Sequence, residues 1–358
     1  MKTSVFPSRY VQGAGALARF SEEAGRFGNH ALALMDANLP DSVLEGLGVT
    51  GDCKVSQKVV KPACTPAAIE ATTEKIRQSG ADIVAGFGGG KVIDLGRAAA
   101  DVLRIPFVSV PTVAASDAPC SALAVIYDEE DRVLNDHFVW RNPDLVLVDS
   151  AVICAAPARF LSAGIGDALA TFYECNACIN SGAGNLCGGT GTQLAYAAAR
   201  LCLETVIKYG EQAVEDCKNH SITDAFERVL EANILLSGIG FESGGVGAAH
   251  AFHNGISELP EVHHMLHGEK VAFGVLAELA LNNYSDEEIV NVARFCKSVD
   301  LPVSLGALGI NSVKAAIPTI ATRAIRPGEI MHNEPMTVTQ DLAEAALFRA
   351  QLLGSSLE

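Results

Sequence analysis

Short apolar runs and helical stretches alternate through the first 150 residues. The apolar runs predict strands at 31–35, 55–60, 82–87, 107–110 and 145–148. Stretches with helical periodicity at 66–79 and 91–103 predict helices, and Thr65 stands where an N-cap is expected, directly before Pro66. Strands that alternate with helices are typical of a mostly parallel sheet with helices on both faces.

The pattern changes after about residue 155. Long segments rich in Ala, Leu and Glu follow, and strand-like runs end. These segments predict helices over 157–180, 190–210, 221–237, 267–284, 286–299 and 340–353. We therefore expect an α/β domain at 1–157 and an all-helical domain at 158–358, with the active site in the cleft between them.

Composition narrows the class of protein. Apolar residues make up 49% of the 358 residues, which excludes intrinsic disorder. With 26 Lys and Arg against 42 Asp and Glu, the net charge is −16, which argues against a nucleic-acid partner. No apolar run approaches the ~20 residues that span a bilayer. The first residues lack a signal-peptide core, so we expect a cytoplasmic protein that does not bind membranes.

The ten cysteines are scattered along the chain and do not form a disulfide framework. In a reducing compartment we expect most of them to be small buried apolar residues. Cys175 and Cys178 have the spacing of a redox or metal motif. They lie in a helical pattern without a second such pair nearby, which favours a structural role.

A glycine-rich turn joins a predicted strand to a predicted helix. It contains Gly88, Gly89 and Gly90, and Lys91 follows it. Glycines there let the backbone approach a ligand, and the amide groups that open a helix attract phosphate. The spacing is neither GxGxxG nor that of a Walker loop. Taken alone, the motif is either a phosphate site or a turn needed for packing.

Asp36 ends a predicted strand well before that turn, whereas the usual ribose-binding carboxylate follows it by about 20 residues. A carboxylate at a strand end accepts a hydrogen bond from a ribose 2′-hydroxyl and repels a 2′-phosphate. Asp36 therefore favours NAD over NADP. The other interpretation is a solvated carboxylate at the end of a strand.

A small polar loop follows the predicted strand at 107–110. Such a loop, at the carboxyl end of a strand, is where open α/β sheets bind ligands. Its hydroxyl groups can donate to phosphate or amide groups, and they belong to Thr112, Ser116 and Ser121. Asp117 can accept hydrogen bonds from a substrate diol, or it can cap an ordinary turn.

Five of the nine histidines lie within residues 250–267, which favours a metal or catalytic site. On a helix, His250 and His253 would share a face, as would His264 and His267. A divalent metal there needs a further donor. Asp167 is the obvious one: it is predicted to start a helix in apolar surroundings, where a charge is costly unless it is paired or coordinates a cation. A helix N-cap is the alternative role for Asp167.

Five segments together resemble the glycerol dehydrogenase family: GFGGGKVID, PTVAASDAPCSALAVIY, GIGDALATFYE, ESGGVGAAHAFHNG and HHMLHGEKVAFG. That family is the zinc-dependent polyol branch of the iron-containing alcohol dehydrogenase superfamily. The resemblance covers nearly the whole chain in order. It implies the dehydroquinate synthase-like fold, with an N-terminal α/β nucleotide-binding domain and a C-terminal helical domain.

The resemblance also implies roles for individual residues. The metal ligands, which would also hold the substrate, are Asp167, His250 and His267. The implied NAD contacts are Asp36, Gly88, Gly89, Gly90, Lys91, Asp94, Thr112, Ala115, Ser121, Leu123 and Tyr127. Asp117 would meet the polyol. His253 is the second catalytic candidate: it would hydrogen-bond a metal-bound water or relay a proton, or it would only orient a ligand.

Three positions depart from the family pattern. The iron enzymes carry a fourth ligand, a histidine, where this chain has Thr171, which leaves the three protein ligands of a catalytic zinc site. Ala115 replaces a serine, which puts one cofactor contact in doubt. Arg97 stands where lysine is common, and we expect that exchange to be neutral.

The implied reaction is the NAD-dependent oxidation of glycerol, or of a similar vicinal diol, at carbon 2. For glycerol the product is dihydroxyacetone; NAD takes the hydride and Zn²⁺ activates the hydroxyl. The alternatives are a 2-hydroxy acid dehydrogenase or another polyol dehydrogenase of the superfamily. A metal-dependent lyase or cyclase is less favoured, because the metal-site segments hold few basic residues. The resemblance also implies a homo-oligomer, an octamer in many relatives.

Overall fold

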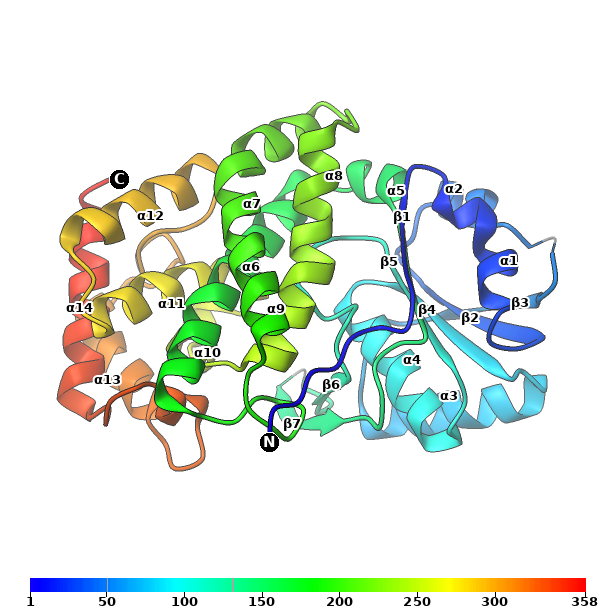
Figure 1. The fold of residues 1–358 in the computed structure, drawn as a ribbon, viewed down its shortest axis with the longest axis horizontal. Coiled ribbons are helices and arrows are strands. Elements are labelled where there is room, and N and C mark those ends of the chain that lie inside the picture. Colours follow the sequence, from blue (N-terminus) through cyan, green and yellow to red (C-terminus); the bar gives the residue numbers. More distant parts are fainter. Residues whose placement is uncertain (50, 131) are drawn as a thin grey trace.

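The computed structural model describes residues 1–49, 51–130 and 132–358 and has two halves of different architecture (Figure 1). Every strand of the described residues ends before residue 150. Helices and loops make up the described chain beyond that point. The predicted fold class, an α/β half followed by a helical half, is therefore confirmed.

Six strands form one parallel sheet in the order β1-β8-β5-β4-β2-β3. They are β1 (Tyr10–Gly13), β2 (His30–Asp36), β3 (Lys54–Val60), β4 (Ile83–Gly88), β5 (Phe107–Pro111) and β8 (Leu145–Asp149). All neighbours pair in parallel, so the carboxyl ends of β2, β4 and β5 meet at one edge of the sheet. The five predicted strands are confirmed, while β1 is short and half-buried and has no apolar run to reveal it.

Alternate residues of β2 pack into two separate cores, one on each face of the sheet. Ala33 and Met35 join the core that contains Phe20, whereas Leu32 and Leu34 join the core that contains Ile76. The helices beside the sheet are α1 (Phe20–Ala24), α2 (Asp41–Gly46), α3 (Pro66–Ser79) and α4 (Gly90–Leu103). Burial of both faces explains why these strands are almost continuously apolar.

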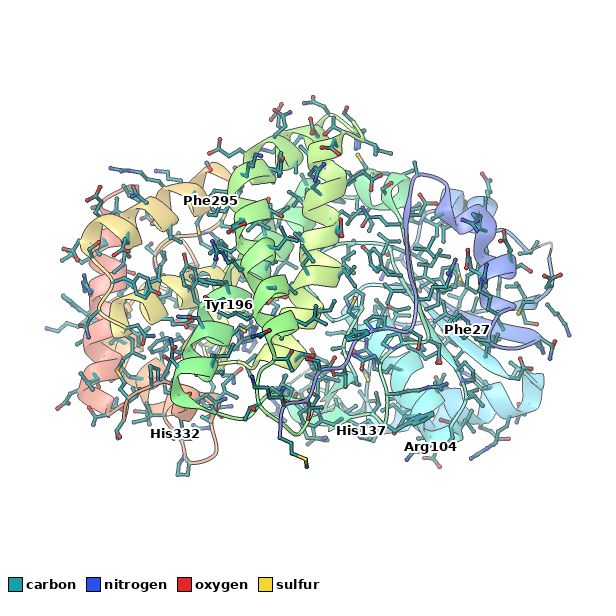
Figure 2. All side chains as sticks on the ribbon, viewed as in Figure 1. Phe27, Arg104, His137, Tyr196, Phe295 and His332 are labelled. Atoms are coloured by element: carbon teal, nitrogen blue, oxygen red, sulfur yellow. The ribbon has the colours of Figure 1, made fainter. Side chains whose placement is uncertain are left out.

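A two-stranded antiparallel hairpin, β6 (Leu123–Tyr127) with β7 (Val133–Phe138), stands apart from the main sheet. Its burial is partial, so the apolar pattern did not predict it. Asp101 of α4 connects the hairpin to the sheet half: its carboxylate lies 3.1 Å from His137 Nε2 and accepts from Arg104 at 3.1 Å. Figure 2 labels His137 and Arg104 near each other at the lower edge of the molecule.

Arg97 is buried and links three segments of the chain. The expected neutrality of its exchange with lysine stays a prediction. Its side chain is 2% exposed and donates to Asp94 at 2.8 Å and to the carbonyl oxygens of Ala118 and Leu123. Asp94 in turn accepts from the Val125 amide at 3.2 Å. One guanidinium therefore joins α4 to the loop after β5 and to β6. A buried cation with this many acceptors determines how the three segments lie relative to one another.

The helical half packs around one large core. After the short α5 (Ser150–Cys154) come α6 (Ala158–Ser181), α7 (Gln193–Lys218), α8 (Asp224–Glu231), α9 (Ser237–Gly244), α10 (Ala248–Ser257), α11 (His267–Leu281), α12 (Asp286–Ser298), α13 (Val313–Ala324) and α14 (Gln340–Ser355). The helix predicted at 221–237 is in fact α8, a π-helical turn at 232–236 and the start of α9. The helix that was expected to carry His250 and His253 is α10, whereas α13 was not predicted. Within the described residues, no helix is both long and apolar enough to span a membrane.

The first residues of the chain lie against the helical half, not against the sheet (Figure 1, dark blue). The Thr3 amide donates to the Thr190 carbonyl at 3.3 Å, and the Val5 amide donates to Ser243 Oγ at 3.0 Å. Residues 1–5 therefore connect the start of the predicted 1–157 domain to the other half. The boundary at residue 157 stays a prediction.

We expect Arg97→Met to destabilise the protein by about 3–5 kcal/mol, because the substitution leaves the Asp94 carboxylate buried without its partner. Denaturant unfolding followed by circular dichroism measures the change. Arg77→Met is the matched control, since Arg77 is exposed on α3 and its ion pair with Glu74 spans 3.7 Å. Equal unfolding midpoints for the two variants would contradict the role assigned to Arg97.

Candidate metal centre between the sheet and the helices

Asp167, His250 and His267 come together from three different helices. One ligand atom from each lies within 4.8 Å of the others. Oδ1 of Asp167 is 3.1 Å from Nε2 of His267 and 3.4 Å from Nε2 of His250. Asp167 is buried, whereas the side chain of His267 is 40% exposed, so the cluster is open on one side. The structure thus brings together the three residues predicted as metal ligands.

Asp167 lies in the middle of α6 and does not start a helix, so the prediction of a helix start was wrong and the N-cap role is excluded. The two glycines that precede Asp167 on α6 have a packing function. A Cβ atom on Gly164 would lie 2.0 Å from the Ala114 carbonyl oxygen, and one on Gly166 would lie 2.3 Å from the Gly268 carbonyl oxygen. Both positions need glycine because another backbone passes there.

The close contact between α6 and α11 brings two of the predicted ligands together. A Cβ atom on Gly268 would lie 1.8 Å from the Ala163 carbonyl oxygen, so the two helices touch through their backbones. Asp167 follows Gly166, and His267 precedes Gly268. His267 opens α11, which leaves His264 in the turn before the helix. The predicted helical face shared by His264 and His267 is therefore wrong.

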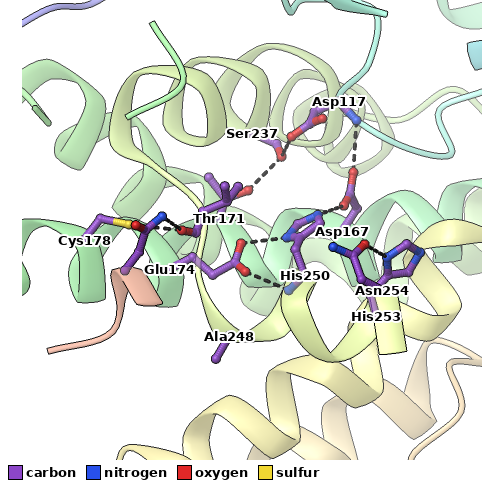
Figure 3. A network of polar contacts seen from close by, with 12 residues as sticks. Asp117, Asp167, Thr171, Glu174, Cys178, Ser237, Ala248, His250, His253 and Asn254 are labelled. Atoms are coloured by element: carbon purple, nitrogen blue, oxygen red, sulfur yellow. Dashed lines mark hydrogen bonds and ion pairs between the residues drawn. The ribbon is translucent and has the colours of Figure 1, made fainter. Parts of the chain in front are cut away.

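Glu174 holds His250 by two hydrogen bonds (Figure 3). One oxygen accepts from the His250 backbone amide at 2.8 Å, and the other lies 2.7 Å from Nδ1 of the ring. This pairing leaves Nε2 to face Asp167, as the outer partner of a metal-binding histidine does. Glu174 was not predicted. The spacing in the sequence could have pointed to Glu174, because it follows Asp167 by two helical turns and so lies on the same face of the same helix.

His253 is the partner of His267. Its Nε2 lies 3.0 Å from Nδ1 of His267, and its Nδ1 lies 3.2 Å from Oδ1 of Asn254. His250 and His253 both lie on α10, so the predicted common helix is confirmed. His253 contacts Nδ1 of His267, the ring nitrogen that does not face Asp167. This contact is what we expect of a residue that orients the His267 ring. A catalytic role for His253 stays a prediction.

The charged groups of the cluster shift one another's pKa values. Burial alone would raise the pKa of Asp167, but His267 and His250 lower that pKa overall. Burial alone would lower the pKa of His250, but Glu174 and Asp167 raise it well above the usual value. Burial and the neighbouring His267 lower the pKa of His253. The centre therefore holds an anionic Asp167 that needs positive charge beside it.

Asp117 connects the sheet half to this cluster. Its backbone amide donates to Oδ2 of Asp167 at 3.2 Å, and its carboxylate accepts from Ser237 at 2.9 Å (Figure 3). Ser237 Oγ lies 2.8 Å from the hydroxyl oxygen of Thr171. Thr171, which stands where the iron enzymes carry their fourth ligand, therefore makes a hydrogen bond within the protein. Burial, with Asp167 nearby, raises the pKa of Asp117 well above its usual value.

Several predicted cofactor residues meet at the carboxyl edge of the sheet, although they are far apart in sequence. A Cβ atom on Gly88 would lie 3.0 Å from Cβ of Asp36, because β2 and β4 are neighbours. The Thr112 amide donates to the Gly88 carbonyl at 3.1 Å. Lys91 Nζ lies 4.9 Å from the ring centre of Tyr127. This edge is where open α/β sheets bind nucleotides.

The other predicted cofactor residues surround this edge. Gly89 is the N-cap of α4 and Gly90 is the first residue of that helix, so backbone amide groups are presented there. Leu123 lies in β6, Ala115 lies in the loop after β5, and Ser121 donates to the Ala118 carbonyl at 3.4 Å. The Asp94 carboxylate is turned to Arg97, which favours a positioning role. All of these cofactor contacts stay predictions.

Cys175 and Cys178 are buried free thiols in the middle of the helical half. A Cβ atom on Gly244 would lie 2.5 Å from Sγ of Cys175, and one on Gly245 would lie 2.7 Å from Sγ of Cys178. Burial raises the pKa of Cys175 to about 12. The pair therefore packs tightly and is poorly suited to redox chemistry.

The chain is similar to known dehydrogenases over its full length. Residues 7–150 match the family model of the iron-containing alcohol dehydrogenases. The glycerol dehydrogenase of Thermotoga maritima is 44% identical over 355 residues, which cover 98% of this chain and 97% of that protein. A second glycerol dehydrogenase, from Pseudomonas putida, is 40% identical over 355 residues, with 97% and 96% covered.

A solved structure has the same fold. The probable glycerol dehydrogenase from Sinorhizobium meliloti 1021 superposes with a TM-score of 0.94 at 38% sequence identity. The superposition covers 99% of this chain and all of that one. The similarity therefore includes both the sheet half and the helical half that carries Asp167, His250 and His267.

We expect Glu174→Gln to weaken zinc binding by about 10- to 100-fold while the fold stays intact, because residues that orient metal-binding histidines have effects of this size. Competition with a chelator of known affinity measures the change. Glu211→Gln, an exposed glutamate on α7, is the control and should bind zinc like the parent protein. Parent-like zinc affinity in Glu174→Gln would show that Glu174 does not position His250.

Proposed function

The chain belongs to the iron-containing alcohol dehydrogenase family, and we propose that it oxidises glycerol and similar vicinal diols with NAD and a bound zinc ion. The chain is similar to glycerol dehydrogenases over nearly its full length, and this similarity shows that its activity is polyol oxidation. The observation that carries the proposal is the convergence of Asp167, His250 and His267 beside Asp117.

The donor set fits zinc. One carboxylate oxygen and two imidazole nitrogens are ligands that zinc prefers, and a catalytic zinc site has three protein ligands and an open position. The buried Asp167 carboxylate also needs a positive charge nearby. When bound, zinc supplies a Lewis acid that lowers the pKa of a substrate hydroxyl. Asp167, His250 and His267 would hold it, and Glu174 would keep His250 turned toward it.

Residues of the chain would orient the polyol. Asp117 is held by two hydrogen bonds: its backbone amide donates to Asp167, and its carboxylate accepts from the Ser237 hydroxyl. Its carboxyl group would bind a substrate hydroxyl and thereby hold the reacting carbon in one position. His253 would keep the His267 ring in place through the 3.0 Å contact between their nitrogens.

The carboxyl edge of the sheet would bind NAD, which supplies the hydride acceptor. The amide groups at the start of α4 and the Lys91 ammonium would meet the pyrophosphate. Asp36 would accept from the adenosine ribose, and its negative charge would repel the 2′-phosphate of NADP. Leu123 and Tyr127 would face the nicotinamide side.

The acidic character of the site disfavours the alternatives. Asp167 is a buried carboxylate whose pKa is lowered overall, so a 2-hydroxy acid would bring a second negative charge next to it. The same repulsion disfavours the phosphorylated or carboxylated substrates of a lyase or cyclase. A neutral polyol has no charge to repel. Cytoplasmic location and assembly into a homo-oligomer remain proposals.

We expect Asp167→Asn to abolish glycerol oxidation while NAD affinity stays within about twofold of the parent protein, because Asp167 belongs to the metal centre and not to the cofactor edge. NADH absorbance measures turnover, and fluorescence titration measures NAD binding. Dialysis against a chelator should also remove the activity, and zinc should restore it. Full activity in the metal-free protein, or equal loss of NAD binding in the variant, would contradict the proposal.

We expect the parent protein to prefer NAD over NADP and Asp36→Ala to lose about tenfold or more of that preference, since the repulsive charge is removed. The ratio of kcat/KM for the two coenzymes measures the effect. Asp52→Ala, which removes an exposed carboxylate of the same half, is the control. An unchanged ratio in Asp36→Ala would contradict the assignment of this carboxylate to the ribose.

A further inference from the structure

A chain of hydrogen bonds leads away from His267 and ends on a glutamate of another segment. Nδ1 of His267 lies 3.0 Å from Nε2 of His253. Nδ1 of His253 lies 3.2 Å from Oδ1 of Asn254, its neighbour on α10 (Figure 3). Nδ2 of Asn254 in turn donates to Oε2 of Glu329 at 3.2 Å, and Glu329 lies in the loop between α13 and α14. Neither Asn254 nor Glu329 has a role in the proposed reaction.

The far end of this chain only accepts hydrogen bonds. Oε1 of Glu329 accepts from the Arg323 guanidinium, and a carboxylate paired with a guanidinium has no proton to give. The Asn254 amide therefore turns its NH2 group to Glu329 and its oxygen to His253. An amide oxygen also only accepts, so the proton in this contact is carried by Nδ1 of His253.

The near end of the chain must donate when zinc is bound. Nε2 of His267 lies 3.1 Å from Oδ1 of Asp167, so it is the ring nitrogen that faces the candidate metal centre. A histidine binds zinc as a neutral imidazole, through a nitrogen that carries no proton. The ring proton of His267 is then on Nδ1 and points to Nε2 of His253. That contact is a hydrogen bond only if Nε2 of His253 accepts.

Both ends of the chain require the same tautomer of His253. In a neutral ring, a proton on Nδ1 leaves Nε2 as the acceptor that His267 needs. If Asn254 presented its NH2 group instead, the proton of His253 would move to Nε2. There it would oppose the proton on Nδ1 of His267, or displace that proton to the nitrogen that faces the metal centre. The orientation of the Asn254 amide therefore decides whether His267 can offer Nε2 to a metal.

Ser257 approaches the same nitrogen of His253 and can also donate to it. Nζ of Lys270 donates to Oγ of Ser257 at 2.8 Å, and an ammonium group has no acceptor. The Ser257 proton is thereby free to point to Nε2 of His253, which lies 3.3 Å away. Two neighbours that can donate agree with an acceptor at this nitrogen.

We propose that Asn254 and Glu329 are positioning residues of the candidate metal centre. Through His253 they keep the ring proton of His267 on Nδ1 and leave Nε2 for zinc. The inference deepens the proposed function and rests on its zinc site.

Asn254→Leu keeps the size of the side chain and removes its acceptor, so we expect it to weaken zinc binding by about tenfold. Competition with a chelator of known affinity measures the change, and circular dichroism checks the fold. Asn291→Leu makes the same exchange at an exposed position of α12 and should bind zinc like the parent protein. Parent-like zinc affinity in a folded Asn254→Leu variant would overturn the inference, whereas a parent protein that binds no zinc would contradict the proposed function itself.

A double-mutant cycle separates positioning from packing. In a His253→Leu background the chain is already broken, so adding Asn254→Leu should cost less than about twofold in zinc affinity. A merely structural Asn254 would cost the same in both backgrounds, and that result would overturn the inference. His253→Gln offers an amide oxygen to Nδ1 of His267 and should bind zinc more tightly than His253→Leu. Equal zinc affinities of these two variants would also count against the inference.

Glu329→Met tests the far end of the chain and serves if Asn254→Leu does not fold. Without an acceptor at residue 329 the Asn254 amide can turn either way, so zinc affinity should fall by about threefold or more. In a His253→Leu background the same substitution should leave zinc affinity unchanged. Parent-like zinc affinity in Glu329→Met would show that Glu329 does not set the polarity of the chain.

Discussion

The candidate metal centre depends on the backbone contact between α6 and α11. Ala163, Gly166 and Gly268 allow the two helices to approach without side chains between them. A similar contact joins α10 to α11, because a Cβ atom on Gly274 would lie 2.3 Å from the Ala249 carbonyl oxygen. Each contact lies within one residue of a proposed ligand. Packing of the helical core therefore sets the separation of the ligand atoms, and the loop after β5 then docks onto the same helix at Gly164.

Burial determines the electrostatics of the site. Asp167 is a buried carboxylate whose partners are two histidine nitrogens and the Asp117 amide, and Glu174 behind His250 adds a second buried carboxylate. Such a group is costly without positive charge, so the fold itself favours a bound cation. The acidic site and the net charge of −16 agree with a neutral polyol as substrate. The anionic cofactor would be bound locally, by amide groups and Lys91.

Elements with a clear apolar periodicity can be predicted from the sequence. Elements that lack such a periodicity cannot. Buried strands and long helices were predicted correctly, whereas β1 and the β6–β7 hairpin are short and only partly buried. The helix start expected at Asp167 was wrong, because Gly164 and Gly166 lie inside α6 and allow other backbone segments to approach it. The resemblance implied the three proposed ligands, which the structure brings together, but Glu174 and the buried role of Arg97 required three-dimensional contacts.

Zinc affinity of Gly268→Ala tests most directly whether the α6–α11 contact positions the ligands. The added Cβ would lie 1.8 Å from a backbone oxygen, so the helices must separate or shift. We predict a loss of about tenfold or more in zinc affinity, because a metal site tolerates only small displacements of its ligands. Gly46→Ala, at an exposed helix position with open space around it, is the control. A folded Gly268→Ala variant with parent-like zinc affinity would contradict the claim.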